Sequence, residues 1–137
     1  MIERVTETAE QTESAGAELA RGLEPGDVVL VAGELGSGKT TLVRGACREL
    51  GVRGPVTSPT FTLGHVLPGD AFEVAHLDLY RLGSLADEDP GVLDDYLTHE
   101  RVGFVEWPEV AEPADLPVAA RVRLQHLGGD RRRITIE

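Results

Sequence analysis

The chain has 137 residues, of which 41% are hydrophobic and 27% are charged, and its formal net charge is −11. This length is enough to bury a real core but leaves little room for a separate substrate domain, so we expect one domain over residues 1–137. So acidic a balance argues against direct binding of a nucleic-acid backbone, which needs clustered Lys and Arg.

The sequence carries no pattern for export or membrane insertion. No apolar run approaches the roughly 20 residues that cross a bilayer. Residues 1–16 are acidic and polar, whereas a secretory signal has a basic segment followed by an apolar one. We therefore expect a cytoplasmic protein without membrane contact. Cys47 is the only cysteine, and its apolar neighbours at helical spacing predict a core residue.

The first third of the chain predicts a helix, a strand and a second helix. Thr8 and Gln11 have the spacing of a capping box, and small and apolar residues then recur at helical intervals. Residues 28–32 are continuously apolar, which is typical of a strand buried on both faces of a parallel sheet. A helix is expected over residues 39–50, where the apolar positions form one stripe and Gly51 follows as a stop signal.

The remaining elements predict a mixed sheet. Residues 54–67 and 71–80 are extended segments separated by Pro-Gly-Asp, which predicts a hairpin. An acidic stretch with a Pro-Gly break follows and predicts one or two short surface helices, and the segment VGFVEW, residues 102–107, predicts a short buried strand that ends in Glu106. Residues 118–127 alternate apolar and polar side chains, and a Gly-Gly-Asp turn leads to residues 131–137, which predicts a C-terminal antiparallel pair.

Residues 33–40 carry the full G-x-x-x-x-G-K-[ST] pattern of a phosphate-binding loop. We expect its backbone N–H groups and the following helix N-terminus to face phosphates, Lys39 to reach the β- and γ-phosphate oxygens, and Thr40 to ligate Mg²⁺. Lys39 is the only lysine among 13 basic residues, which favours this dedicated role over a chance glycine-rich turn. The expected fold is an α/β P-loop NTPase with a mixed sheet flanked by helices.

A P-loop site needs a further carboxylate for the metal, usually at the end of a neighbouring apolar strand. Glu106 ends one such segment and Asp78 lies in another, so one would hold Mg²⁺ and the other would orient or activate the attacking water. Either could instead be an exposed strand-end residue. His76 shares a strand face with Asp78, although a lone histidine is more often structural. Arg81 suits a structural ion pair better than an arginine finger.

Two further patterns bear on function. The hydroxyl-rich segment 56–62 follows the predicted P-loop helix, where switch segments sense the γ-phosphate, although a solvated strand would use threonine as readily. A guanine reader of the N-K-x-D type is excluded, because the chain has no Asn and its one Lys belongs to the loop. Adenine or loose base specificity remains.

The segments GELGSGKTTLVRG, VTSPTFTL, HLDLYRL, DDYL and VEWPE, in this order, closely resemble the TsaE (YjeE) family. Its members are small bacterial ATPases needed to make threonylcarbamoyladenosine next to the anticodon of tRNA. The resemblance runs over residues 28–109. It implies an ATPase, with ATP and Mg²⁺ as cofactors, that docks on the threonylcarbamoyl transferase subunit TsaD and its inactive paralogue TsaB and drives or resets that complex. Contact with tRNA would then be indirect.

The resemblance also implies roles for individual residues. Thr40 and Glu106 would ligate Mg²⁺, and Asp78 would be the catalytic carboxylate beside Lys39. Thr12 falls where family members contact nucleotide from the N-terminal segment. The phosphates would be held by Gly33, Glu34, Leu35, Gly36, Ser37, Gly38, Lys39, Thr40 and Thr41, and the switch-like residues would be Ser58, Thr60 and Thr62. Beyond the matched segments, we expect arginines 131–133 to decorate a final strand rather than to reach nucleotide or a partner.

We expect slow hydrolysis in isolation, because a small site with one lysine and no evident arginine finger stabilises the transition state weakly. Partners should then stimulate turnover. Two other classes stay open at this point. One is a minimal nucleotide or metabolite kinase with Asp78 as the base, and the other is a nucleotide-gated adaptor in which hydrolysis is incidental.

Overall fold

The computed structural model describes residues 1–57, 64–79, 92–107 and 117–137 of the chain. These residues form seven strands and three helices. In chain order the elements are β1 (Ile2–Thr6), α1 (Ala9–Ala20), β2 (Val28–Gly33), α2 (Lys39–Glu49), β3 (Gly64–Pro68), β4 (Glu73–Asp78), α3 (Val92–Tyr96), β5 (Arg101–Glu106), β6 (Val118–Gly128) and β7 (Arg131–Ile136).

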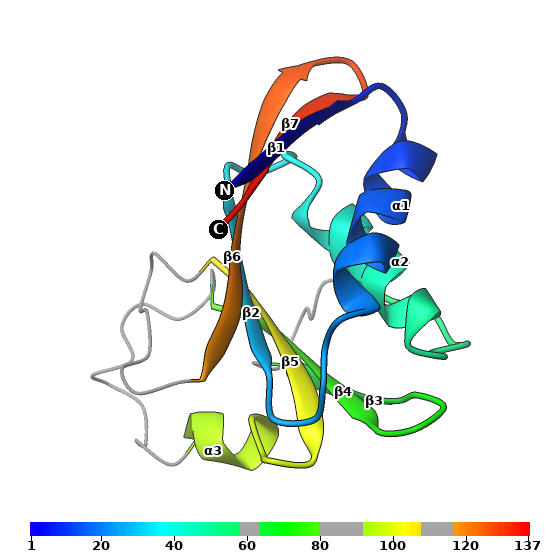
Figure 1. Ribbon diagram of the computed structural model, residues 1–137, viewed down its shortest axis with the longest axis vertical. Coiled ribbons are helices and arrows are strands. Elements are labelled where there is room, and N and C mark those ends of the chain that lie inside the picture. Colours follow the sequence, from blue (N-terminus) through cyan, green and yellow to red (C-terminus); the bar gives the residue numbers. More distant parts are fainter. Residues whose placement is uncertain (58–63, 80–91, 108–116) are drawn as a thin grey trace.

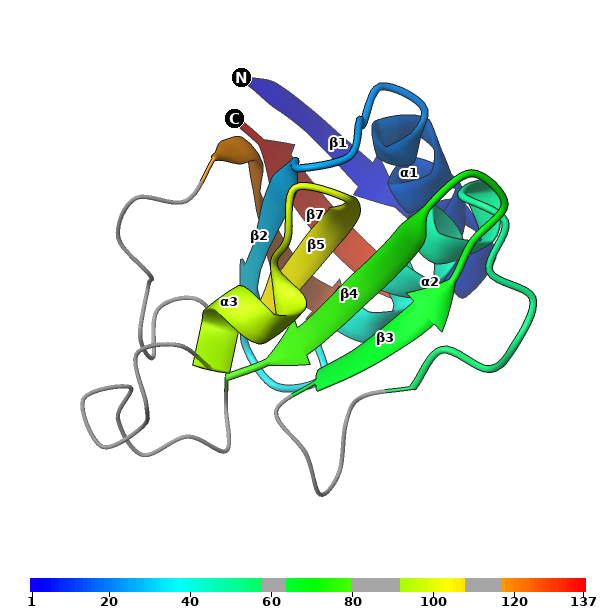
Figure 2. The ribbon, with the colours of Figure 1, turned by 90° about the horizontal axis from the view of Figure 1, so that it is seen from below.

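One mixed sheet contains all of these strands in the order β1-β7-β6-β2-β5-β4-β3. The central strands β6, β2, β5 and β4 are parallel, whereas β1, β7 and β3 pair antiparallel with their neighbours. Helices α1 and α2 lie together on one face of the sheet, and α3 lies on the other (Figures 1 and 2). The expected α/β fold, with a mixed sheet flanked by helices and a C-terminal antiparallel pair, is confirmed.

Parallel strands end at the same edge of a sheet, so their carboxyl ends gather the residues that follow or finish them. At this edge β2 ends in Gly33, β4 in Asp78 and β5 in Glu106. The hairpin predicted before Asp78 is present, since β3 and β4 are antiparallel with His65 opposite His76. The sheet therefore brings the two predicted carboxylates next to the glycine loop.

Helix α1 begins where the capping pattern predicts, because the Thr8 side chain accepts a hydrogen bond from the Gln11 N–H at 3.1 Å. It then packs unusually close to α2 through two glycines. A Cβ atom on Gly16 would lie 2.0 Å from the Leu42 carbonyl oxygen, and one on Gly45 would lie 1.9 Å from the Glu13 carbonyl oxygen. Only glycine permits this approach, which fixes α1 beside the helix that starts at the phosphate loop.

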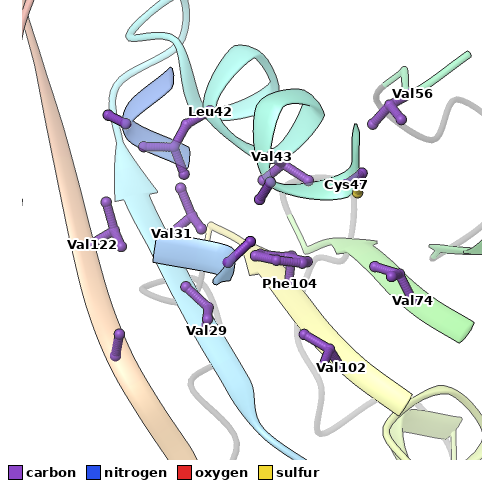
Figure 3. Packing of buried hydrophobic residues seen from close by; sticks show 14 of the residues in the cluster. Val29, Val31, Leu42, Val43, Cys47, Val56, Val74, Val102, Phe104 and Val122 are labelled. Atoms are coloured by element: carbon purple, nitrogen blue, oxygen red, sulfur yellow. The ribbon is translucent and has the colours of Figure 1, made fainter. Parts of the chain in front are cut away.

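The core has one layer on each face of the sheet. The larger layer packs α1 and α2 onto the sheet through side chains such as Val31, Leu42 and Phe104 (Figure 3). The other contains Leu30 and residues of β4 and β5, with α3 against it. Cys47 is fully buried in the larger layer as predicted, and burial raises the pKa of its thiol to about 12.

Strand β1 was not predicted. It pairs antiparallel with β7, with Ile2 opposite Ile136, and so extends the C-terminal pair to three strands. Its side chains do not alternate cleanly, because β1 is an edge strand whose residues are mostly exposed. Among the helices that the structure describes, none has the length and apolar character needed to cross a bilayer.

Candidate functional site

The loop between β2 and α2 has the backbone shape that phosphate binding needs. Gly36 and Gly38 take left-handed conformations with φ of 78° and 97°, which favour glycine. A Cβ atom on Gly33 would lie 2.5 Å from the Ser37 hydroxyl oxygen, so the loop also turns tightly at its start. Gly38 is the N-cap of α2 and provides no capping side chain. The first N–H groups of the helix are thus left for a ligand of negative charge.

Lys39 is held across this loop. Its side chain is 5% exposed, and Nζ donates to the carbonyl oxygens of Gly33 at 2.6 Å and Glu34 at 2.9 Å. The ammonium also lies 3.7 Å from the ring centroid of Trp107. Trp107 follows Glu106 with φ of 61°, a left-handed conformation that is costly for a non-glycine residue and recurs at functional sites.

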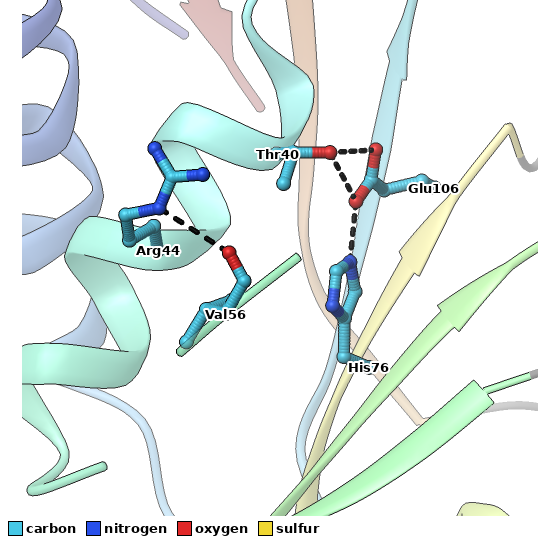
Figure 4. Close-up of polar contacts among 5 residues, drawn as sticks. All are labelled: Thr40, Arg44, Val56, His76 and Glu106. Carbon is cyan, nitrogen blue, oxygen red and sulfur yellow. Dashed lines mark hydrogen bonds and ion pairs between the residues drawn. The ribbon is translucent and has the colours of Figure 1, made fainter. Parts of the chain in front are cut away.

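Side chains from α2, β5 and β4 meet beside the loop (Figure 4). The Thr40 hydroxyl lies 3.1 Å from each of the two carboxylate oxygens of Glu106. Nε2 of His76 forms a short hydrogen bond with Oε2 of the same carboxylate. His76 is 0% exposed and Glu106 is 2% exposed. A carboxylate buried to this degree needs such donors, because an unpaired buried charge is very costly.

Asp78 lies next to this group. It is 8% exposed and stands opposite Glu106 in the parallel register of β4 and β5. Residues that pair in register point to the same face, so both carboxylates face α2. The structure therefore places Asp78, Glu106 and Thr40 at one edge, as the sequence predicted, while their chemical roles stay predictions.

The oxygen donors present fit Mg²⁺. Magnesium prefers hydroxyl, carboxylate and phosphate oxygens and usually completes its shell with water and substrate. The Thr40 hydroxyl oxygen and a carboxylate oxygen of Glu106 already lie 3.1 Å apart. Within the described part of the chain, no group of three or more His, Cys, Asp or Glu side chains is arranged around a metal position. A site of this composition suits a metal that arrives with a nucleotide.

A small cavity flanks the other side of the loop. Its volume is about 110 Å³, and it is lined by Ala9, Thr12, Gly38, Thr41, Asp130 and Arg132. Thr12 therefore lies beside the phosphate loop, where the family resemblance puts a nucleotide contact. Its hydroxyl is 2.7 Å from that of Thr6 on β1, which fixes the side chain.

These features agree with the comparisons with known proteins. The family model described as "Threonylcarbamoyl adenosine biosynthesis protein TsaE" matches residues 6–134. The chain belongs to the TsaE family. Relatives carrying the description "tRNA threonylcarbamoyladenosine biosynthesis protein TsaE" include one from Streptomyces coelicolor, 43% identical over 117 residues that span 84% of this chain and 79% of the relative. Another, from Treponema pallidum, is 35% identical and is covered over 97% of its length, against 96% of this chain.

A solved structure supports the same family assignment. The crystal structure of Bacillus subtilis YdiB matches with a TM-score of 0.79 and 28% identity, over 98% of this chain and 83% of that chain. The Bacillus subtilis TsaE sequence is 34% identical to this one over 130 residues. The fold of that structure is thus shared over nearly the whole chain.

The three C-terminal arginines differ in ways that the sequence did not predict. Arg131 and Arg133 form ion pairs with Glu7 at 3.0 Å and Glu3 at 3.5 Å, which agrees with residues that decorate a strand. Arg132 points instead toward the phosphate loop, where Nη2 donates to the Gly36 carbonyl oxygen at 3.2 Å. Strand alternation separates Arg132 from its neighbours, but only the structure shows that the face of Arg132 is the one turned to the glycine loop.

Arg44 is a second residue that sequence reasoning did not single out. It lies one helical turn after Thr40, and its Nε donates to the Val56 carbonyl oxygen at 3.2 Å (Figure 4). Arg44 thereby ties the P-loop helix to Val56, the first residue of the predicted switch-like segment 56–62. The residues predicted there, Ser58, Thr60 and Thr62, and the arginine at 81 lie outside the described residues.

Proposed function

We propose that this protein binds ATP with Mg²⁺ and hydrolyses the ATP during the formation of threonylcarbamoyladenosine in tRNA. The observation that carries the proposal is the Thr40–Glu106 pair, at 3.1 Å, next to a complete phosphate loop and to the in-register carboxylate of Asp78. Family membership supports the pathway, since the matching relatives are described as tRNA threonylcarbamoyladenosine biosynthesis proteins.

The phosphate loop would bind the triphosphate through its backbone N–H groups and Lys39. The Lys39 ammonium, now on the carbonyl oxygens of Gly33 and Glu34, is a compact charge on a flexible stem, so it can turn to phosphate oxygens bound in this loop. Thr40 and Glu106 would hold Mg²⁺. The bound metal would neutralise charge that develops on the phosphate oxygens.

Asp78 would act on the attacking water. A water oxygen forms a bond to the γ-phosphorus, the bond from that phosphorus to the β–γ bridging oxygen breaks, and ADP and phosphate result. Asp78 orients the water molecule or accepts its proton. The carboxylate is suited to this because it is nearly buried and lies beside, rather than on, the Thr40–Glu106 pair.

The whole chain would act as one domain in the cytoplasm. One sheet takes strands from both ends of the chain, so the N-terminal and C-terminal segments belong to the same unit. The partners proposed are TsaD and TsaB, which would stimulate turnover and carry the tRNA. The acidic net charge of −11 is in keeping with an indirect role toward RNA.

The test of this function is the fate of the γ-phosphate. The purified protein is incubated with γ-labelled ATP in Mg²⁺ and in EDTA, and the label is followed to inorganic phosphate or to an organic acceptor. Release to water that needs Mg²⁺ supports the proposal. Transfer to a nucleoside or metabolite would favour a kinase, and hydrolysis unchanged by EDTA would contradict the metal site.

A further inference from the structure

His76 occupies a position where an apolar side chain would suit the packing. It lies on β4 between Val74 and Asp78 and is 0% exposed, on the same sheet face as Val74 and as Phe104, its register neighbour on β5. Both of those neighbours belong to the apolar layer under α2. A polar ring at such a position calls for a reason, because its nitrogen atoms must find partners without water.

Only one nitrogen of His76 has a partner among the described residues. Nε2 bonds to Oε2 of Glu106, whereas Nδ1 is buried and without a hydrogen bond in the described structure. An ionised carboxylate only accepts, so the hydrogen atom of this bond belongs to Nε2 of the histidine. Within the part of the chain that the structure describes, the hydrogen bonding of the ring is therefore directed to the carboxylate of Glu106.

This bond acts on the orientation of Glu106. Oε2 accepts from both His76 and Thr40, while Oε1 faces the Thr40 hydroxyl alone. A glutamate has several rotatable bonds, and the donor on β4 holds its carboxylate toward the start of α2. Carboxylates that ligate metals are commonly oriented by such outer donors.

We propose that His76 is a positioning residue for the metal and nucleotide site, where its Nε2–H fixes the Glu106 carboxylate beside Thr40. This inference rests on the proposed function, because it concerns how the chain binds Mg²⁺ together with a nucleotide. Loss of the donor should weaken Mg²⁺ binding to the nucleotide complex by about 10- to 100-fold. Binding of nucleotide without metal should change little, because Lys39 bonds to the carbonyl oxygens of Gly33 and Glu34, whereas His76 bonds to Glu106.

The protein has its own fluorescent reporter for measuring metal binding and nucleotide binding separately. Trp107 is the only tryptophan, and its ring lies 3.7 Å from the Lys39 ammonium. Trp107 fluorescence is measured while ADP is added in EDTA, and then while Mg²⁺ is added at saturating ADP. Mn²⁺ binding followed by electron paramagnetic resonance gives a second reading that needs neither fluorescence nor turnover.

Three variants separate positioning from packing. His76→Gln places an amide N–H near the position of Nε2 and should keep metal affinity close to that of the wild type. His76→Asn is too short to reach Glu106 and His76→Leu has no donor, so both should lose the 10- to 100-fold in Mg²⁺ affinity while affinity for metal-free ADP stays. His65→Leu, on the neighbouring strand opposite His76, is the matched control and should behave as the wild type.

The outcomes are distinct. Equal loss of metal affinity in His76→Gln and His76→Asn would overturn the inference, and so would wild-type Mg²⁺ affinity in His76→Leu. Should His76→Leu fail to fold, the Gln and Asn pair still decides. If the wild-type protein itself shows no Mg²⁺ effect on nucleotide binding, the proposed function fails instead, whatever the variants do.

Discussion

Two regions of the sheet use polar side chains in opposite ways. At the carboxyl ends of β4 and β5, the polar side chains of His76, Asp78 and Glu106 are nearly or fully buried, and Glu106 bonds both to His76 and to Thr40 of α2. In the antiparallel β1–β7–β6 region, the ion pairs are exposed, as in Arg131–Glu7 with side chains 55% and 57% exposed. Buried polar groups cost stability unless they are paired, so their concentration at the first region marks the chemistry there.

The largest effect should come from the buried region. Asp78→Asn keeps the size of the side chain but removes the charged acceptor, so ATP hydrolysis should fall by about 100- to 10,000-fold. Affinity for ADP should stay near the wild-type value, because the phosphates bind to the loop. Phosphate release measures the first and Trp107 fluorescence the second.

Asp70→Asn is the matched control for that experiment. Asp70 is exposed, and its partner Arg53, 3.9 Å away, is exposed as well. Its substitution should leave hydrolysis unchanged. If Asp78→Asn hydrolyses ATP as fast as Asp70→Asn, the buried carboxylate has no catalytic role. Burial of polar groups at the ends of β4 and β5 would then not indicate catalysis.

The next largest effect is expected at the contact between α1 and α2, which joins the two regions. Helix α1 carries Thr12 toward the C-terminal hairpin, α2 carries Thr40 toward Glu106, and Gly45 lets the helices touch. Gly45→Ala would force a methyl group against the Glu13 carbonyl, 1.9 Å from its oxygen, and should cost about 1–3 kcal/mol of unfolding free energy. Urea denaturation measures the change.

Gly22→Ala provides the comparison for Gly45, because a Cβ atom at Gly22 would meet nothing within 4 Å. We expect its unfolding free energy to stay within about 1 kcal/mol of the wild type or to rise slightly. Equal stability of the two variants would show that the helices separate at little cost.

Within the antiparallel region, substitution of Arg132 should weaken nucleotide binding, whereas substitution of the neighbouring Arg131 should not. Arg132→Gln removes the charged bond to the Gly36 carbonyl and changes the lining of the small cavity, so ADP should bind about 10-fold more weakly. Arg131→Gln, which affects only the surface pair with Glu7, is the control and should bind ADP normally. Isothermal titration of both variants with ADP decides; identical affinities would remove Arg132 from the site.

The smallest effect belongs to the exposed pairs themselves. Glu7→Gln breaks the ion pair with Arg131, which is 3.0 Å long but more than half exposed at both ends. Such pairs contribute about 0–1 kcal/mol and are screened by salt. Thermal unfolding at low and high salt should show a small difference that disappears in high salt. A loss that persists in high salt would mean that β1 depends on this pair.

The sequence predicted those parts of the molecule that local patterns determine. The apolar run of β2, the glycine loop and the stripe of α2 are all readable from neighbouring residues, and the structure has them in place. The alternation and the Gly-Gly-Asp turn of β6 and β7 likewise sufficed for the C-terminal pair. Asp78 and Glu106 were singled out because each belongs to an apolar strand segment.

Contacts that depend on strand order and register could not be predicted from the sequence. The bond between His76 and Glu106 joins residues 30 positions apart, and it exists because β4 lies beside β5 in one particular register. The third strand of the C-terminal unit, β1, has no clear alternation, and its partner is at the other end of the chain. Arg132 stands between two other arginines, and the sequence alone does not distinguish the three. Only the pairing of β7 distinguishes them.

A partner-stimulated ATPase is tested by the rate of phosphate release from ATP by this protein alone and with the TsaD–TsaB heterodimer from the same organism. We predict a slow, Mg²⁺-dependent rate that rises when the heterodimer is added, and no such rise for Asp78→Asn. Equal rates with and without the heterodimer, or stimulation that survives in Asp78→Asn, would contradict the claim that the buried carboxylates form a partner-stimulated ATPase site.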